Sequence, residues 1–286
     1  MGNANTRLDN ELELRYERYK DTLKELTIMS DIFMRNVFKK RECVEYVLRI
    51  IMEINDLRVV EQTIQKDYKN LQGRSAILDC VARDDKNKRY NVEIQQETEG
   101  ASYKRARYHS GLIDMNTLNP GQDYEELPDS YVIFITRDDV PGDGLPIYHA
   151  DRVIKETGKM FGDGSHIIYV SSGIQDNSTE LGKLMHDIHC KNANEMYSNV
   201  LAQRVSELKE TEEGIDSMCK EMEWIYRESE LQGEARGEAR GEAKGKIEER
   251  KKTAKVLAKR KMPVEEIAEI LDEKIDTLKE WLVEET

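Results

Sequence analysis

The chain has 286 residues and a formal net charge of -13, with 35% charged and 38% hydrophobic residues, which is enough for one α/β domain and a separate tail. Mean hydropathy is -0.74 and no apolar run approaches the roughly 20 residues that span a bilayer, so we expect no membrane-spanning helix. The negative charge argues against a general polyanion binder, although basic residues cluster locally.

The first part of the chain is expected to be helical. Residues Leu8 to Lys24 alternate charged and apolar side chains at helical spacing, which predicts a surface helix. A second helix is expected to begin at Ser30, whose hydroxyl can cap it, and to carry Phe33 on its apolar face. Helical spacing continues or restarts from Cys43 to Asn55.

Three strands are predicted next, because β-branched or apolar residues alternate with polar ones between turn signals. They are Arg58 to Gln65, Ser75 to Arg83 and Lys88 to Gln96. Residues Ser102 to Leu118 are expected to form a helix that ends at the Asn-Pro-Gly breaker after it. The apolar run SYVIFIT, Ser130 to Thr136, predicts a strand that is covered on both faces.

The remaining part of the core is predicted from weaker signals. A Gly/Pro loop covers Val140 to Pro146, and a further strand is expected from His166 to Val170. From Thr179 onward the sequence reads as helix with no strand signal. The expected order is therefore one helical region, three strands, a helix and a strand, followed by a helical half.

A four-residue repeat, GEARGEARGEAKGK, runs from Gly233 to Lys246. On a helix every fourth residue advances about 400°, so the glycines form one stripe, flanked by a Glu stripe and an Arg/Lys stripe. Such a helix is weak alone, because each glycine costs about 1 kcal/mol against alanine and like charges repel. Self-association along the glycines and a partly helical, flexible linker are equally consistent with the repeat.

The last part of the chain has the apolar spacing of a small helix-turn-helix. Its expected core residues are Ile267, Ile270, Leu271, Ile275, Leu278, Trp281 and Leu282. A DNA-reading unit should carry basic or amide side chains on its last helix, whereas this one carries Asp276, Glu280, Glu284 and Glu285. The pattern favours a protein-contact or folding role over DNA reading.

Two neighbouring apolar segments each contain a single carboxylate, Asp79 and Glu93. A buried ionised carboxylate is costly unless it is paired. Because side chains alternate along a strand, Glu93 and Gln95 share one face, and a short hairpin can bring Asp79 beside them. Oxygen ligands of this kind suit Mg²⁺ or Mn²⁺, which can activate a water molecule for attack on a phosphodiester.

Two further groups can contribute to this site. Asp31, at the expected helix start, is a candidate third carboxylate, but an acidic residue there is equally explained by the helix dipole; Glu42 and Glu45 are weaker substitutes. The helix after Gln95 carries basic and aromatic residues that can contact phosphates, or that simply form a solvated basic face. These residues are Lys104, Arg105, Arg107 and Tyr108.

Four motifs together resemble the recombination-promoting nuclease / putative transposase family of the PD-(D/E)XK nuclease superfamily. They are Ser30-Asp31-Ile32-Phe33, Leu78-Asp79, Val92-Glu93-Ile94-Gln95 and Tyr103-Lys104-Arg105-Ala106-Arg107-Tyr108. The resemblance implies an α/β fold with a PD-(D/E)XK-type core, an αβββαβ mixed sheet flanked by helices, followed by a helical region and a helical tail. It also implies a Mg²⁺- or Mn²⁺-dependent DNA endonuclease linked to recombination or transposition. Asp79, Glu93 and the backbone of Ile94 would then hold the metal, and Asp31 would be the helix carboxylate.

The sequence departs from the superfamily pattern at Gln95, where a lysine is usual. A neutral amide is neither a cation nor a general base, although it can orient water or a phosphate. Lys104 or Arg105 can supply the positive charge instead. The alternative hypothesis is a catalytically weak or inactive nuclease fold that acts as a DNA-binding or regulatory protein and self-associates through its tail.

A second cluster, His186-Asp187-Ile188-His189-Cys190, has two histidines three residues apart, as in some zinc sites. No second ligand pair lies nearby in sequence, so a structural role is favoured. The other cysteines, Cys43, Cys80 and Cys219, are widely spaced and form no CxxC pair, which favours reduced thiols in a cytoplasm.

The expected domains are a nuclease-like core at 1–175, a helical extension at 176–232, the repeat helix or linker at 233–250 and a helix-turn-helix-like tail at 251–286. The expected partners are DNA and further copies of the chain, joined through the tail, with no membrane.

Overall fold

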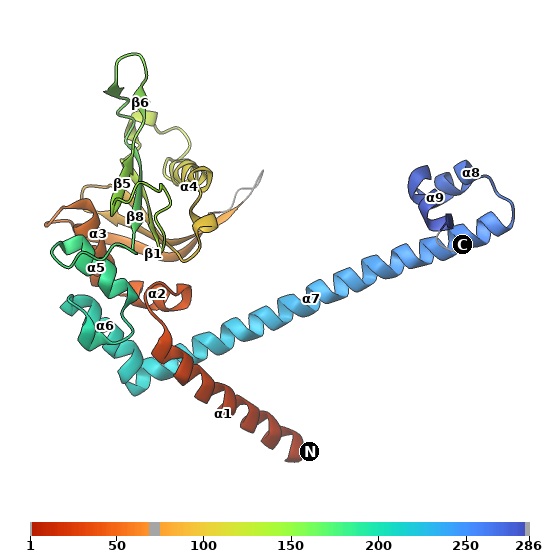
Figure 1. The fold of residues 1–286 in the computed structure, drawn as a ribbon, viewed down its shortest axis with the longest axis horizontal. Helices are drawn as coiled ribbons and strands as arrows, with labels where there is room; N and C mark the ends of the chain where they lie inside the picture. The colour runs from red at the N-terminus through yellow and green to blue at the C-terminus, as the bar shows by residue number, and fades with distance from the viewer. Residues whose placement is uncertain (1, 69–74, 284–286) are drawn as a thin grey trace. The chain divides into compact units, whose positions relative to one another are not determined.

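The computed structural model describes residues 2–68 and 75–283. The chain divides into two compact units, Met1–Met222 and Glu223–Thr286, and the division falls inside the long helix α7 (Glu212–Lys259). Each unit has its own apolar core and is described by itself (Figure 1).

The first unit is built on a six-stranded mixed sheet with the order β1-β2-β3-β4-β8-β5. The β1/β2, β2/β3 and β5/β8 pairs are antiparallel, whereas β3/β4 and β4/β8 are parallel. The strands are β1 (Val59–Tyr68), β2 (Ala76–Asp84), β3 (Arg89–Gln95), β4 (Ser130–Thr136), β5 (Ile147–Ala150) and β8 (Ser165–Ser171). Strands β6 (Val153–Ile154) and β7 (Lys159–Met160) form a separate small hairpin.

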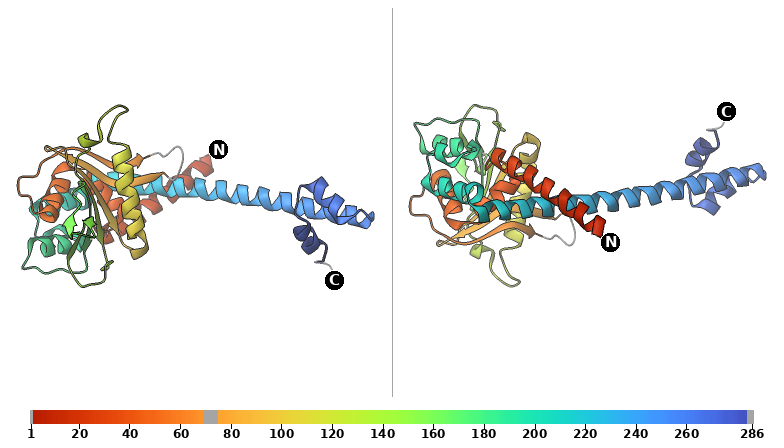
Figure 2. Two further views of the ribbon diagram at one scale, coloured as in Figure 1. Left: turned by 90° about the horizontal axis from the view of Figure 1, so that it is seen from above. Right: turned by 90° about the horizontal axis from the view of Figure 1, so that it is seen from below.

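Helices cover both faces of the sheet (Figures 1 and 2). The larger core joins one face to α1, α2, α3, α5 and α6, and the smaller core joins the other face to α4. These helices are α1 (Gly2–Glu25), α2 (Asp31–Phe38), α3 (Arg41–Met52), α4 (Tyr103–Met115), α5 (Glu180–His189) and α6 (Asn199–Glu210). Strand β4 is buried along its whole length, as expected for an apolar run between two helical layers.

The predicted fold class is confirmed: α2 and α3, the three strands β1 to β3, α4 and β4 follow one another in the expected order. The sequence reading missed β5, β6 and β7. β6 and β7 have two residues each, which is too short for a periodic signal. Helix α4 ends at Met115, before the expected Leu118, because Asn116 and Thr117 bond back to backbone carbonyls of Leu112 and Ile113.

The second unit contains the last part of α7 with α8 (Val264–Leu271) and α9 (Ile275–Val283). Its buried core is Ala254, Ile267, Ala268, Leu278 and Trp281. The prediction that Ile270 and Ile275 belong to this core is wrong. The two residues are 57% and 38% exposed, on the outer side of these short helices. Glu284 and Glu285 lie outside the described residues.

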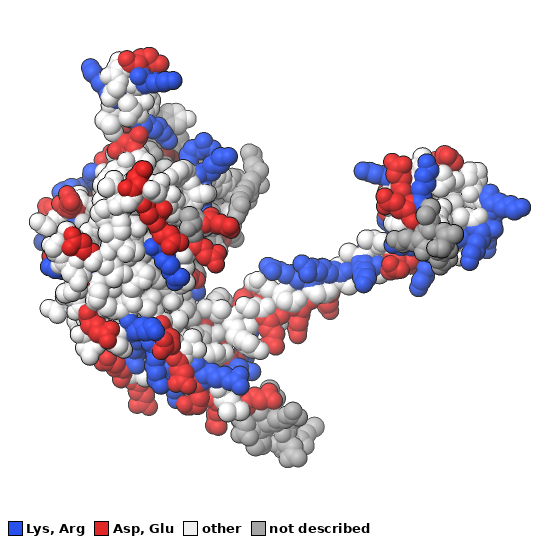
Figure 3. Space-filling view, viewed as in Figure 1, with Lys and Arg blue, Asp and Glu red and all other residues white. Residues whose placement is uncertain are grey.

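The repeat Gly233 to Lys246 is helical throughout, as part of α7. Along this helix, Lys and Arg lie on one side and Asp and Glu on the opposite side (Figure 3). A Cβ atom added at any of the four repeat glycines would meet no other atom within 4 Å, so the glycine stripe faces open space. Within the described part of the chain, no helix has the length and apolarity needed to cross a membrane.

Candidate metal centre and nucleic-acid groove

The candidate centre lies where the β2/β3 ladder opens. Regular pairing ends at Cys80 and Val92, and the next residues are Asp79 and Glu93. The backbone N–H of Asp79 donates to Oε1 of Glu93 at 3.2 Å, and the backbone N–H of Ile94 donates to Oδ2 of Asp79 at 3.4 Å. Each carboxylate thus satisfies a backbone group of the opposite strand, and this brings the two predicted acidic residues together.

This arrangement changes the pKa of Asp79. Burial and, after it, the nearby charges of Glu93 and Asp31 together raise the pKa of its carboxyl to about 8. Like charges held close in a partly dry site favour either protonation or a bound cation. A divalent ion therefore fits the donor set: it would supply the positive charge that this group of oxygens lacks.

Glu93 is completely buried and is held by α4 and by its own strand. Its Oε1 accepts from Nδ2 of Asn91 at 3.0 Å and lies 3.5 Å from Nδ1 of His109. Its Oε2 lies 3.4 Å from a guanidinium nitrogen of Arg105. Nε of Arg105 donates to Nε2 of His109 at 3.4 Å, which leaves Nδ1 as the ring nitrogen that faces Glu93.

Sequence reasoning missed Asn91 and His109. Asn91 lies two residues before Glu93 and so shares its strand face, and His109 lies four residues after Arg105 and so shares its helix face. These spacings would have placed both residues near the predicted centre. Neither spacing predicted a contact with Glu93, because that contact depends on how α4 packs on the sheet.

Asp31 begins α2 and lies at the rim of the centre. It forms an ion pair with Arg35 at 3.1 Å, and its charge reaches Asp79. Both interpretations of Asp31 therefore keep support: it pairs as a first-turn helical acid does, and its charge also acts on Asp79. With Asp79 and Gln95 it lines a hollow of about 430 Å³.

Gln65 lines the same hollow and was not predicted. It occupies the β1 position opposite Asp79, between the pairs Ile64–Cys80 and Lys66–Leu78. Its φ of 51° is in the left-handed region, which typically costs a residue other than glycine about 1–3 kcal/mol. Its side-chain oxygen accepts from Arg35 at 3.0 Å, so Arg35 holds this side chain at the hollow.

Gln95 is positioned by the turn that follows β3. A methyl group at Gly100 would overlap the side-chain oxygen of Gln95, so a larger residue at this place would displace the Gln95 amide. Arg105 donates to the carbonyl of Gly100 at 2.9 Å and fixes this turn against α4. Arg105 therefore contacts both the turn that holds Gln95 and the carboxylate of Glu93.

A basic groove of about 820 Å³ adjoins the acidic hollow, and Ile77 lines both. The groove includes four of the residues predicted to contact phosphates, namely Lys104, Arg105, Arg107 and Tyr108. Tyr103, from the same motif, packs edge-on against Tyr169 at 5.5 Å between ring centroids. The structure thus places the basic residues beside the paired carboxylates on one continuous surface.

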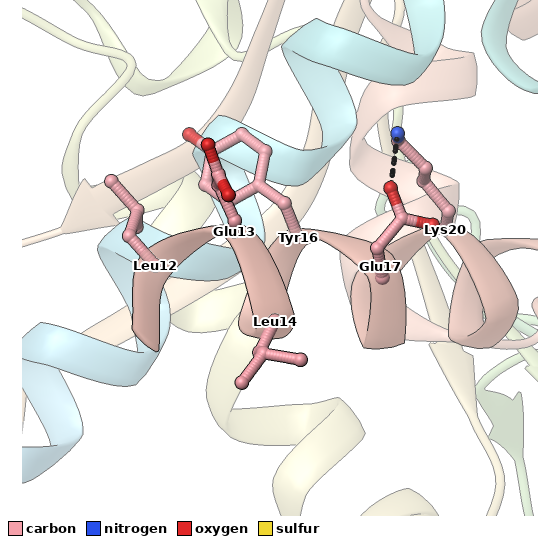
Figure 4. Close-up of a pocket in the computed structure, with 6 residues that line it drawn as sticks. All are labelled: Leu12, Glu13, Leu14, Tyr16, Glu17 and Lys20. Carbon is pink, nitrogen blue, oxygen red and sulfur yellow. Dashed lines mark hydrogen bonds and ion pairs between the residues drawn. The ribbon is translucent and has the colours of Figure 1, made fainter. Parts of the chain in front are cut away.

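Another hollow, of about 800 Å³, lies along α1 and has a different character (Figure 4). It is lined by Leu12, Glu13, Leu14, Tyr16, Glu17 and Lys20, with Lys20 paired to Glu17 at 2.8 Å. Its charged groups come from successive turns of a single helix. It offers no convergent set of buried acidic groups, unlike the surroundings of Asp79.

The six-stranded mixed sheet flanked by helices has the form of a PD-(D/E)XK nuclease core. The sequence pattern of the PD-(D/E)XK nuclease family transposases matches residues 42–232, which is more than half of the chain. The chain belongs to this family, and the resemblance of its motifs is confirmed. No curated protein and no solved structure matches it significantly.

Replacement of Asp79 by asparagine should change how stability depends on pH in the metal-free protein. The folded-state pKa of about 8 lies above the ordinary value of 3.8, so the folded state binds more protons between these values and stability falls as pH rises through them. At pH 8 the free energy of unfolding of Asp79→Asn should therefore exceed that of the wild type by about 1 kcal/mol or more. This corresponds to a melting temperature higher by roughly 2–4 °C, and the difference should disappear near pH 4. Melting curves in EDTA measure it.

Addition of Mn²⁺ at pH 8 should raise the melting temperature of the wild type but not of Asp79→Asn. Asp85→Asn, in the exposed β2–β3 turn, is the matched charge-removal control. Equal stability changes for Asp79→Asn at both pH values would contradict the buried carboxylate pair.

Proposed function

We propose that this protein is a Mg²⁺- or Mn²⁺-dependent DNA endonuclease that acts in recombination or transposition. The observation that carries the proposal is the meeting of Asp79 and Glu93 at the open end of the β2/β3 ladder, beside a basic groove. Family membership supports phosphodiester hydrolysis as the chemistry, with a divalent metal as cofactor and DNA as substrate.

Asp79, Glu93 and the backbone carbonyl of Ile94 would hold the metal. When bound, Mg²⁺ or Mn²⁺ would supply an acidified water and neutralise charge on the scissile phosphate. Glu93 has its orientation set by Asn91 and His109, and Asp79 faces the hollow. Asp31 would extend the acidic surface from the opposite rim.

The role usually taken by a lysine is divided among other groups in this proposal. Gln95 can donate from its amide to the attacking water or to a phosphate oxygen, but it cannot take up a proton. Arg105 brings a permanent positive charge to within 3.4 Å of Glu93. Because a guanidinium stays protonated, Arg105 can stabilise the phosphate but cannot act as a base.

The DNA backbone would lie along the groove over the start of α4. Lys104 and Arg107 are exposed there, and Tyr108 lines the groove beside them. Phosphate contacts of this kind hold the duplex in place without reading its sequence. The local basic surface lets a chain with a net charge of -13 bind DNA at one place.

A second candidate function, a DNA-binding or regulatory protein without turnover, is favoured by one observation. Gln95 stands where a lysine is usual, and the Glu93 carboxylate already accepts from several protein donors. That function predicts salt-dependent retention of DNA with no cleavage in any divalent metal.

The proposed organisation keeps a nuclease core at 1–175, a helical extension at 176–232, the repeat helix at 233–250 and the tail at 251–286. We also propose self-association through the repeat and a cytoplasmic location for the reduced, buried cysteines. The exposed glycine stripe, flanked by opposite charges, supports close packing of two such helices.

Cleavage of supercoiled plasmid tests the enzymatic proposal. The wild type should nick DNA in Mn²⁺ or Mg²⁺ and not in EDTA, and Asp79→Asn and Glu93→Gln should each reduce the rate at least about 100-fold, since each removes a metal ligand. Asp85→Asn should cut at the wild-type rate. Equal nicking by wild type and Asp79→Asn would assign the activity to another protein or site.

The groove is tested by the salt dependence of DNA binding. Replacement of both Lys104 and Arg107 by glutamine should weaken duplex binding and make the slope of log K against log salt less negative by about 2, one unit for each lost phosphate contact. Lys86→Gln, in the exposed turn at the other end of β2, is the control. An unchanged slope in the double variant would place the DNA elsewhere.

Self-association is tested by light scattering on the full-length chain. Replacement of Gly237 and Gly241 by leucine should lower the particle mass, because bulky side chains keep the two helices apart. Leucine at Ala235 and Ala239, about 200° around the helix from the glycines, is the matched control and should leave the mass unchanged. Equal masses for both pairs would rule out packing along the glycines.

A further inference from the structure

A cluster of three metal-binding side chains lies at the end of α5. Among the described residues, His186, Asp187 and Cys190 are the one group of three or more His, Cys, Asp or Glu whose ligand atoms all lie within 4.8 Å of one another. The sequence pattern had pointed to His189 as the second histidine. The structure instead pairs His189 with the hydroxyl of Ser172 at 2.9 Å, and it keeps Asp187 in the cluster.

We propose that His186, Asp187 and Cys190 bind one Zn²⁺ ion. Nδ1 of His186 lies 3.4 Å from Sγ of Cys190 and 3.3 Å from Oδ1 of Asp187. Bond lengths of about 2.0–2.1 Å for N and O and 2.3 Å for S, at tetrahedral angles, separate ligand atoms by about 3.3–3.6 Å. Both separations at His186 therefore match those around a shared zinc.

The three ligands are held in place by groups behind them. Oδ1 of Asp187 accepts from the backbone N–H of Tyr197, and Oδ2 accepts from that of Ser198, each at 2.8 Å. The ring of His186 packs edge-on against the ring of Tyr197, with centroids 4.9 Å apart. Supporting contacts of this kind orient ligands before the metal arrives and strengthen its binding.

The charge of Asp187 is a second, independent observation that points to a cation. Its side chain is completely buried, and in the part of the chain that the structure describes, the ring of His186 is the one basic group within ion-pair distance. Buried carboxylates are normally paired with a cation or coordinate a metal. Two backbone N–H groups satisfy hydrogen bonding but bring no net charge, which a divalent ion would supply.

The ligand types select zinc over the metals proposed for the nuclease centre. A thiolate and an imidazole prefer zinc, whereas Mg²⁺ and Mn²⁺ prefer oxygen. The ring of His186 is partly exposed, so water can fill the fourth position. The ion would fix the end of α5, and the hydrogen bonds from the backbone N–H groups of Tyr197 and Ser198 to Asp187 link that end to the segment before α6.

Cobalt substitution in the full-length protein tests this site independently of nuclease activity. Protein stripped with a chelator and kept reduced would be titrated with Co²⁺ in excess Mg²⁺, which occupies oxygen-ligand centres. The expected result is one Co²⁺ per chain, with a thiolate-to-cobalt charge-transfer band that Zn²⁺ removes by displacement. The absence of this band in the wild type would overturn the proposal.

Matched variants identify the ligands. Cys190→Ser should abolish the charge-transfer band, and His186→Gln, at a partly exposed ring, should weaken Co²⁺ binding at least about 10-fold while the fold is retained. Cys219→Ser, at a cysteine remote from the cluster in sequence, should keep the full band. A band that survives Cys190→Ser, or unchanged affinity in His186→Gln, would show that the three side chains are held by hydrogen bonds alone.

Discussion

The structure around the candidate centre depends on one constraint: two carboxylates must stay close together at a place where two strands stop pairing. Asp79 and Glu93 take over the backbone N–H groups that the open ladder leaves without a partner. This exchange explains why acidic residues are tolerated in apolar strands. Burial, together with the nearby charges of Glu93 and Asp31, also raises the pKa of Asp79, so an ionised pair at this place is costly without a cation. A bound cation is the simplest physical complement to that arrangement.

The surrounding residues form two groups, one that contacts Glu93 and one that lies with Asp79 around the hollow. Glu93 is buried beneath α4, where Asn91, His109 and Arg105 fix its direction. Asp79 faces the hollow with Gln65 and Asp31, whose positions are both set by Arg35. One carboxylate is thus buried and held by several groups, and the other lines the hollow. The left-handed backbone at Gln65 fits this division, since strain of that kind persists where surrounding contacts enforce it.

The sequence was sufficient where a local rule decided the structure. The two-residue period placed Glu93 and Gln95 on a shared face, and the apolar run at 130–136 predicted a fully buried strand, which is confirmed. Local rules failed where tertiary packing determined which residues are buried or in contact. Ile270 fits a helical stripe but lies outside the tail core, because α8 has only eight residues and buries one narrow face. Gln65 gave no signal, because its importance comes from strand register and from Arg35 on another helix.

Two kinds of metal chemistry can be present in one chain only if the ligands keep the ions apart. The centre at Asp79 offers oxygen atoms, whereas the cluster at Cys190 offers nitrogen, sulfur and one carboxylate. Zinc binds most sites more tightly than magnesium, so affinity alone would not protect the oxygen centre. A thiolate-containing site elsewhere in the fold binds zinc preferentially. Exchangeable Mg²⁺ or Mn²⁺ would then serve the nuclease centre, while the tighter ion would hold the end of α5 in place.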